Sequence, residues 1–276
     1  MSKADRSLRK KKRRGEGQRP TVVAVYFILR LLVAAVLVLS ALRRDWESVF
    51  VCGLVLFLFL LPNFFEKRLH VQLPSLLEII ILLFIFSAEI LGELQSYYVR
   101  FAHWDTLLHT INGFVCAAVG FSLVDILCRN KQEKFRLSPI FVALVAFCFS
   151  MTVGVLWEFF EYGMDTFFHT DMQKDTVIHT LHTVALDGTA SNRVVSVGNI
   201  ASAAVNGEEL GLGGYLDIGL HDTMEDLLVN FIGAAVFVPI GYVYIKQRGR
   251  GRLGRLAGQF IPTLQEEPPK KTEEQP

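Results

Sequence analysis

The chain has 276 residues, of which 51% are hydrophobic and 20% are charged, and its mean hydropathy is +0.37. Soluble domains are usually more polar, and disordered chains, coiled coils and collagen-like fibres have other compositions. The composition therefore excludes those three classes and makes a soluble enzyme a poor fit. The net charge is only +1, yet nine of the 28 Lys and Arg lie in the first twenty residues.

Six apolar stretches are long enough, or nearly so, to cross a bilayer core as helices of about 20 residues. In chain order they are residues 21–42, 46–62, 74–94, 105–127, 138–162 and 222–245. We expect an all-α, polytopic bundle of about six transmembrane helices. The predicted plan is a basic cytoplasmic tail at 1–20, helices 1–5 within 21–165, an extracytoplasmic loop at 166–221, helix 6 at 222–245 and a disordered cytoplasmic tail at 246–276.

The basic residues predict the orientation of this bundle. With the N-terminus inside, the inner segments hold 22 of the 28 Lys and Arg, as cytoplasmic loops usually do. The run Arg9–Arg14 is better interpreted as a topology determinant that touches anionic lipid than as a nucleic-acid arm. We therefore expect a multi-pass protein of the inner or plasma membrane, with both termini cytoplasmic. Its predicted partner is the lipid bilayer, with no nucleic acid, and the sequence names no protein partner.

The segment 166–221 is polar and rich in Gly, Ala, Ser and Asn. A connection of this length usually has a function of its own. We expect it to form a loop-rich cap over the extracytoplasmic face of the bundle.

Ionisable residues gather at the ends of four predicted helices, where they follow helical spacing. Residues spaced by three, four, seven or eight positions share one face of a helix. Ionisable side chains inside membrane spans are costly, and they usually face the bundle interior or an aqueous cavity. The nine candidates for a metal site are Glu89 and Glu93, Asp105 and His109, Glu158, Glu161 and Asp165, and Asp222 and Asp226.

The alternation of helix direction places all four groups in one layer, in the outer half of the membrane. So many carboxylates need a bound cation, protonation or basic partners. Basic partners are scarce, because only Arg100 lies near this layer in sequence, with Arg43 and Arg44 within reach. Carboxylates with one imidazole suit a divalent ion such as Zn²⁺, Mn²⁺, Mg²⁺ or Fe²⁺. The four Cys lie elsewhere, which excludes a thiolate site, and no other cofactor is indicated.

Some of these residues have a purely structural alternative. Asp105 and Asp222 are also good helix N-caps, and Glu93 is close enough to a helix end to be solvated. Glu158 and Glu161 are the strongest candidates, because Trp157 and Phe159 indicate a helix still within the membrane. No nucleophile elbow, phosphate loop or zinc-protease motif is present, so the sequence names no catalytic residue.

Three motifs together resemble the YjdF-like family of bacterial membrane proteins. They are Trp104-Asp105 with His109, Trp157-Glu158 with Glu161-Tyr162, and Asp222-Thr223 with Asp226. The resemblance covers the chain from about the third helix to the sixth. It implies a polytopic inner-membrane protein and supplies no reaction.

Three functions fit these observations. The first is a metal-dependent enzyme acting on a lipid-linked or cell-envelope substrate, with Glu158, Glu161, Asp226 and His109 as ligands and another acid as base. The second is a cation transporter or proton-coupled permease, in which the same acids form a path. The third is a structural or sensory scaffold, in which the acids bond to one another. The sequence leaves open whether the protein is an enzyme.

Overall fold

The computed structural model describes residues 20–69, 71–129, 137–247 and 250–264. It is mostly helical, and six helices are long and apolar enough to cross a membrane: Pro20–Arg43, Trp46–Arg68, Ser75–Leu94, Trp104–Leu127, Pro139–Phe168 and Leu220–Gln247. The prediction of an all-α polytopic bundle with about six transmembrane helices is confirmed. The basic segment 1–19 lies outside the described residues.

The first half of the bundle comprises α2 (Pro20–Arg43), α3 (Trp46–Leu58), α4 (Leu61–Leu69), α5 (Ser75–Ile85), the π-helix η1 (Phe86–Leu94) and the short α6 (Tyr97–Arg100). Helix α3 begins where Asp45 accepts a hydrogen bond from the Ser48 N–H, and it is followed by α4 within the same span. The interior of this half is mainly apolar, with Val33, Cys52 and Val55 fully buried, but it also contains the buried carboxylate Glu78 of α5.

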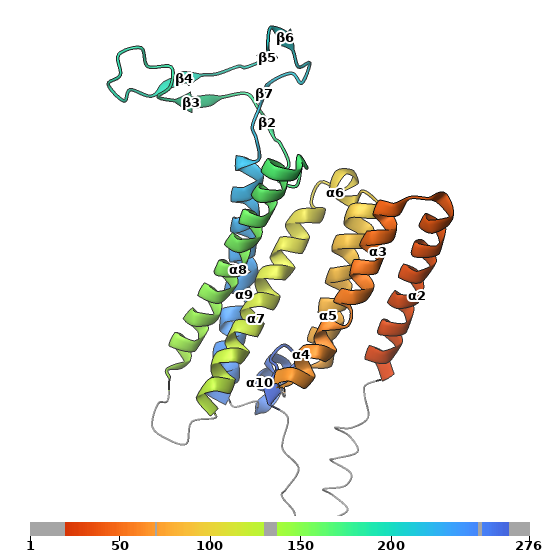
Figure 1. Cartoon of the computed structure of the whole chain (residues 1–276). Helices are drawn as coiled ribbons and strands as arrows, with labels where there is room; N and C mark the ends of the chain where they lie inside the picture. Colours follow the sequence, from red (N-terminus) through yellow and green to blue (C-terminus); the bar gives the residue numbers. More distant parts are fainter. Residues whose placement is uncertain (1–19, 70, 130–136, 248–249, 265–276) are drawn as a thin grey trace, which may run out of the picture.

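The second half comprises α7 (Trp104–Arg129), α8 (Pro139–Phe168) and α9 (Leu220–Gln247), which all pack on one another (Figure 1). The start of α8 is stabilised by an N-cap, because the Ser138 side chain accepts a hydrogen bond from the Phe141 N–H, and Pro139 occupies the first turn. Helices α7 and α9 touch backbone to backbone: a Cβ on Gly113 would collide with the Asn230 carbonyl, and one on Gly233 with the Thr110 carbonyl. Small residues permit such close approach of membrane helices.

The surface of the helices carries many large apolar side chains. Examples are Phe27, Phe50, Leu144 and Phe231, all of which are exposed. Water would not tolerate a surface of this kind, whereas lipid tails do. The exposed residues therefore agree with a bundle that is surrounded by lipid.

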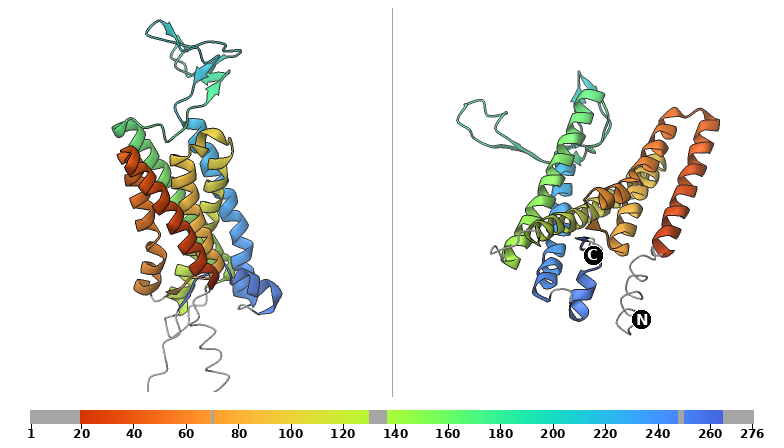
Figure 2. Two further views of the ribbon diagram at one scale, coloured as in Figure 1. Left: turned by 90° about the vertical axis from the view of Figure 1, so that its right-hand side faces the viewer. Right: turned by 60° about the horizontal axis from the view of Figure 1, so that its bottom comes forward.

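The segment between α8 and α9 forms short antiparallel strand pairs instead of a cap. It contains β2 (Val177–Ile178), β3 (Leu181–Thr183), β4 (Val195–Val197), β5 (Ala204–Val205), β6 (Glu208–Glu209) and β7 (Tyr215–Leu216). The pairs are β2 with β7, β3 with β4, and β5 with β6. Figures 1 and 2 show that this segment stands away from the helices, joined to them at the ends of α8 and α9. The expected cap over the bundle is therefore wrong in shape.

The chain beyond α9 folds back onto the bundle. It forms α10 (Gly251–Ala257) and β8 (Thr263–Leu264), which pairs with β1 (Val71–Gln72). Ile261 is fully buried against Phe121 and Phe237 in the core of the second half. The expected disorder of residues 246–276 is thus wrong for 250–264, because apolar residues among the polar ones supply a buried anchor; residues 265–276 lie outside the described part.

Candidate functional site

Three helix faces bring most of the predicted site residues together. Figure 1 shows that η1 ends, α7 begins, α8 ends and α9 begins at the same end of the bundle, next to the strand pairs. On α7, Asp105 and His109 are one helical turn apart, as are Asp222 and Asp226 on α9. Helical spacing turns these side chains toward the shared interface of α7, α8 and α9.

Five side chains form what we call the acid–His cluster: Asp105, His109, Glu158, Glu161 and Asp226. They fall into two groups of three, one of Asp105, His109 and Asp226 and one of Glu158, Glu161 and Asp226. Within each group the ligand atoms lie within 4.8 Å of one another, and Asp226 belongs to both. One carboxylate on α9 therefore connects the donors of α7 with those of α8.

The distances from His109 to two neighbouring carboxylates indicate what kind of contact these side chains make. Its Nε2 lies 3.4 Å from Oδ1 of Asp105 and 3.6 Å from Oδ2 of Asp226. Charge-assisted hydrogen bonds are shorter, about 2.7–2.9 Å. Two atoms that each bind a tetrahedral ion at about 2.0–2.1 Å lie about 3.4 Å from each other. The observed distances suit common ligands of one ion better than a hydrogen-bonded pair.

The carboxylates of the cluster are deeply buried. Asp226 is 3% exposed, Glu158 4% and Glu161 6%. Among the described residues, one oxygen of each is a buried polar atom without a hydrogen-bond partner: Oδ2 of Asp226, Oε2 of Glu158 and Oε2 of Glu161. A buried carboxylate without a partner is costly, so these three oxygens point to a cation or to protons.

The acid–His cluster has few basic neighbours in the part of the chain that the structure describes. Within the described ranges, no Lys or Arg forms an ion pair with any of its five members. Arg100, Arg43 and Arg44, which were the expected sources of positive charge, are absent from the ion pairs of this part of the chain. The donor set of four carboxylates and one imidazole fits a divalent cation by ligand type, and such an ion would offset two of the carboxylate charges.

Polar contacts tie the three helices together on the side of the acid–His cluster away from the strand pairs. Asn230, one turn beyond Asp226, is 1% exposed and donates to the Ser150 carbonyl at 3.4 Å. Asn112 donates to Oδ1 of Asn230 at 3.4 Å, and the Ser150 hydroxyl donates to the Gly113 carbonyl at 2.7 Å. Below them, Phe121 and Phe237 are fully buried. The interface of α7, α8 and α9 is therefore closed beneath the cluster.

Two of the predicted ligands instead anchor the segment between α8 and α9. Asp165 accepts from the Thr170 hydroxyl and from the backbone N–H groups of Met172 and Gln173, at 2.7–2.8 Å. Oδ2 of Asp222 accepts from the Lys174 N–H at 2.8 Å. Neither residue belongs to the groups of ligand atoms. Their role in the structure is to hold the base of the loop against the helix ends.

The two acids of the third span lie apart from the cluster. Glu89 and Glu93 both lie on η1, where Glu89 is half-buried and Glu93 is exposed. The groups of ligand atoms in the described part of the chain do not include them. Sequence reasoning placed them at the same end of the bundle as the other acids, but the structure does not bring them into the acid–His cluster.

Three neighbours of the site were not recognised from sequence. Trp157, interpreted there only as a sign that the helix is still within the membrane, donates from Nε1 to Oε1 of Glu161 at 2.9 Å. Lys174 acts electrostatically on Asp105 and Asp222 from the base of the loop. Burial, with the nearby charges of Asp105 and Glu93, raises the pKa of the Tyr98 phenol above its usual range, so this group remains neutral. Only the Trp157–Glu161 spacing of four residues offered a signal in the sequence.

The fold and the acid–His cluster define the class: a polytopic α-helical membrane protein with buried ionisable residues at one end of a three-helix interface. A family model described as a predicted membrane protein (DUF2238) matches residues 25–247, and the chain belongs to this YjdF-like family. The match extends over all six helices, which is more than the motifs alone indicated. Searches of curated proteins and of solved structures gave no match.

Proposed function

We propose that the acid–His cluster holds a divalent metal ion and that the protein is a metal-dependent enzyme for a lipid-linked or cell-envelope substrate. The observation that carries the proposal is the set of three buried carboxylate oxygens without partners, from α8 and α9, beside an imidazole at ligand spacing. In this proposal, His109, Asp226, Glu158 and Glu161 hold the ion. A divalent ion in such a site supplies Lewis acidity and makes water more acidic, which serves hydrolysis.

The side chains of the cluster have distinct tasks in this proposal. Trp157 fixes the carboxylate of Glu161 by its hydrogen bond, so the other oxygen of Glu161 remains directed to the ion. Asp105 also lies at ligand spacing from His109, but it is the most exposed member of the cluster, with 29% of its side chain accessible. We assign it the transfer of a proton at the edge of the cluster, where substrate would arrive.

The closed interface beneath the cluster favours an enzyme over a transporter. A cation path needs polar groups or water across the whole membrane. Here the polar side chains continue inward only as far as Asn112, Asn230 and Ser150, and the buried rings of Phe121 and Phe237 lie beyond them. A scaffold is also less well supported, because a structural network would satisfy its buried oxygens internally.

We place the cluster in the outer half of a cell membrane, with both termini in the cytoplasm. The support comes from the basic residues: Lys67, Arg68, Lys246, Arg250 and Arg252 lie on or beside α4, α9 and α10 at the end away from the cluster. Excess Lys and Arg is typical of cytoplasmic segments. Labelling of single Cys variants at Arg193 and Arg252 in intact cells tests this orientation; labelling at position 252 alone would reverse it.

Elemental analysis of detergent-purified protein tests the metal site. We expect close to one equivalent or more of Zn²⁺ or Mn²⁺ after supplementation, and loss of that metal in Asp226→Asn. The matched control is Glu225→Gln, which removes one charge from the neighbouring, exposed position. The absence of metal in all samples would refute the proposal, as would equal losses in both variants.

The enzymatic part has its own test. Metal-loaded protein is incubated with a total membrane lipid extract, and the products are compared by mass spectrometry with those of Asp226→Asn. Release of a headgroup or of phosphate that depends on Asp226 is the expected result. A metal that is bound but leaves the extract unchanged would refute hydrolysis of lipid-linked substrates while leaving the metal site intact.

A further inference from the structure

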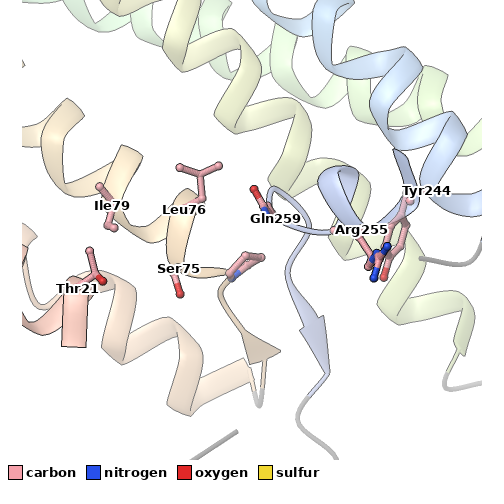
Figure 3. A pocket seen from close by; sticks show the side chains of 10 residues that line it. Thr21, Ser75, Leu76, Ile79, Tyr244, Arg255 and Gln259 are labelled. Atoms are coloured by element: carbon pink, nitrogen blue, oxygen red, sulfur yellow. The ribbon is translucent and has the colours of Figure 1, made fainter. Parts of the chain in front are cut away.

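A pocket lies at the opposite end of the bundle from the acid–His cluster, between its two halves. It has a volume of about 510 Å³ and is bounded by residues of α2, α5, α9 and α10 (Figure 3). The folded segment after α9 forms one side, and it is fixed there by the buried Ile261 and by the pairing of β8 with β1. The pocket is thus a built feature that depends on the part of the chain expected to be disordered.

The lining of this pocket combines apolar and polar side chains, and Thr21 and Ser75 lie on the same side as Leu76 and Ile79 (Figure 3). Leu76 and Ile79 of α5 lie on one side of the view in Figure 3, and Tyr244 and Arg255 lie on the other, with Gln259 between them. Arg255 is the charged residue of the lining, which contains no Asp or Glu. A ligand that suits these walls has an anionic group and an apolar part.

The guanidinium of Arg255 is available to such a ligand. Its Nε donates to the Gly251 carbonyl at 3.2 Å, which orients the side chain along α10. In the described residues no carboxylate forms an ion pair with it. The planar fork of an Arg side chain matches the oxygens of a phosphate group.

The surroundings of the pocket identify the source of this ligand. The helices that bound it are membrane-spanning helices, so phospholipid is the amphiphile present at the highest concentration. Further basic residues lie at the same end of the bundle, including Lys67, Arg68, Lys246 and Arg252. Basic pockets between membrane helices bind anionic lipid headgroups.

We propose that this pocket binds one anionic phospholipid and thereby joins the two halves of the bundle. The phosphate contacts Arg255, with Gln259 and Tyr244 as neighbouring polar groups, and an acyl chain lies along Leu76 and Ile79. This site is separate from the acid–His cluster and does not depend on a metal.

The test uses the full chain, purified in detergent, with phosphatidylglycerol or phosphatidylcholine added. Native mass spectrometry counts bound lipid, and thermal unfolding measures its effect. We expect one retained phosphatidylglycerol and a higher melting temperature with this lipid than with phosphatidylcholine. In Arg255→Gln, the preference for phosphatidylglycerol falls about ten-fold, which corresponds to the loss of a charged hydrogen-bonding partner.

The matched control is Arg252→Gln, which removes an exposed charge from the same helix but does not line the pocket. It keeps the preference for phosphatidylglycerol. Equal losses in the two variants would show attraction by the general surface charge and overturn the proposal, as would an unchanged preference in Arg255→Gln. A further variant ends at residue 264. If it binds more lipid than the full chain, the acidic C-terminal segment occupies the pocket, and the lipid proposal is overturned.

Discussion

The two halves of the bundle use the same kind of helix but bury different chemistry. The half built by α2, α3, α5 and η1 has a mainly apolar interior of residues such as Val33, Val55 and Leu82, and of its described acids Glu78 of α5 is buried. The half built by α7, α8 and α9 has an apolar core as well, yet it also buries His109, Glu158, Glu161 and Asp226. Membrane helices associate through close packing and small residues without any need for buried acids. The first half buries a single described acid, whereas the second half gathers several around one His, and we propose that this gathering serves a ligand.

The largest effect that we expect is a loss of metal affinity on changing the cluster residues of the second half, but not on changing the acids of the first half. His109→Ala and Glu158→Gln each remove a donor from the acid–His cluster and should weaken metal binding at least about 100-fold, because loss of an outer partner alone costs about 10–100-fold. Glu89→Gln and Glu93→Gln, which change the two acids of η1, should leave metal affinity unchanged. Titration with Zn²⁺ against a chelating dye measures all four. Equal losses from both pairs would mean that the two halves form one site.

The second prediction concerns the folded segment after α9. Ile261→Ala deletes a fully buried side chain and should destabilise the protein by about 2–5 kcal/mol, as large-to-small core substitutions do. Leu256→Ala, on the exposed side of α10, should cost much less. Thermal unfolding in detergent compares the two. Similar melting temperatures would mean that the C-terminal segment does not contribute to the core of the second half.

The third prediction concerns the backbone contact of α7 with α9. Gly113→Ala should destabilise the protein by about 1–3 kcal/mol, because the new methyl group meets the Asn230 carbonyl and the helices must separate. Gly163→Ala lies on α8 with open space around it and should be neutral or slightly stabilising, since Ala is a better helix former. Melting temperatures again give the comparison, and a stable Gly113→Ala protein would contradict the close approach of these helices.

The smallest effect is expected from Trp157→Phe. It removes the hydrogen bond to Glu161 but retains an aromatic ring on the lipid-facing side, so metal affinity should fall about ten-fold, as for other outer-shell changes. Phe159→Leu, an exposed change on the same helix, is the control. An unaltered metal affinity in Trp157→Phe would mean that the hydrogen bond of Trp157 to Glu161 does not support the metal site.

Much of the fold was predictable because the bilayer imposes a simple rule on sequence. Each span needs a long apolar run, and the six runs are visible directly. The ends of helices were harder: the fifth span continues to Phe168, beyond the expected end at Tyr162. The folded segment at Gly251–Leu264 escaped prediction because the tail was judged by the polar composition of its end, although Leu253, Leu256, Phe260 and Ile261 recur at helical spacing.

The site was predictable to the level of helix faces but not of partners. The spacing of Asp105 with His109 and of Glu158 with Glu161 placed each pair on one face, and the structure brings these four residues together with Asp226. The same argument could not separate Asp222 and Asp165 from the others, because their role depends on backbone N–H groups of the loop. Spacing along a helix gives the direction of a side chain, whereas the partner that it meets depends on how the helices pack.

The most direct test of the central claim is X-ray absorption spectroscopy of the zinc-loaded protein. The account predicts a first shell of oxygen and nitrogen atoms at about 2.0–2.2 Å, with the outer-shell scattering of one imidazole. That imidazole contribution should vanish in His109→Ala and persist in Glu225→Gln. A shell of oxygen atoms alone in the unaltered protein, or an imidazole signal that survives in His109→Ala, would contradict the assignment of the metal to the acid–His cluster.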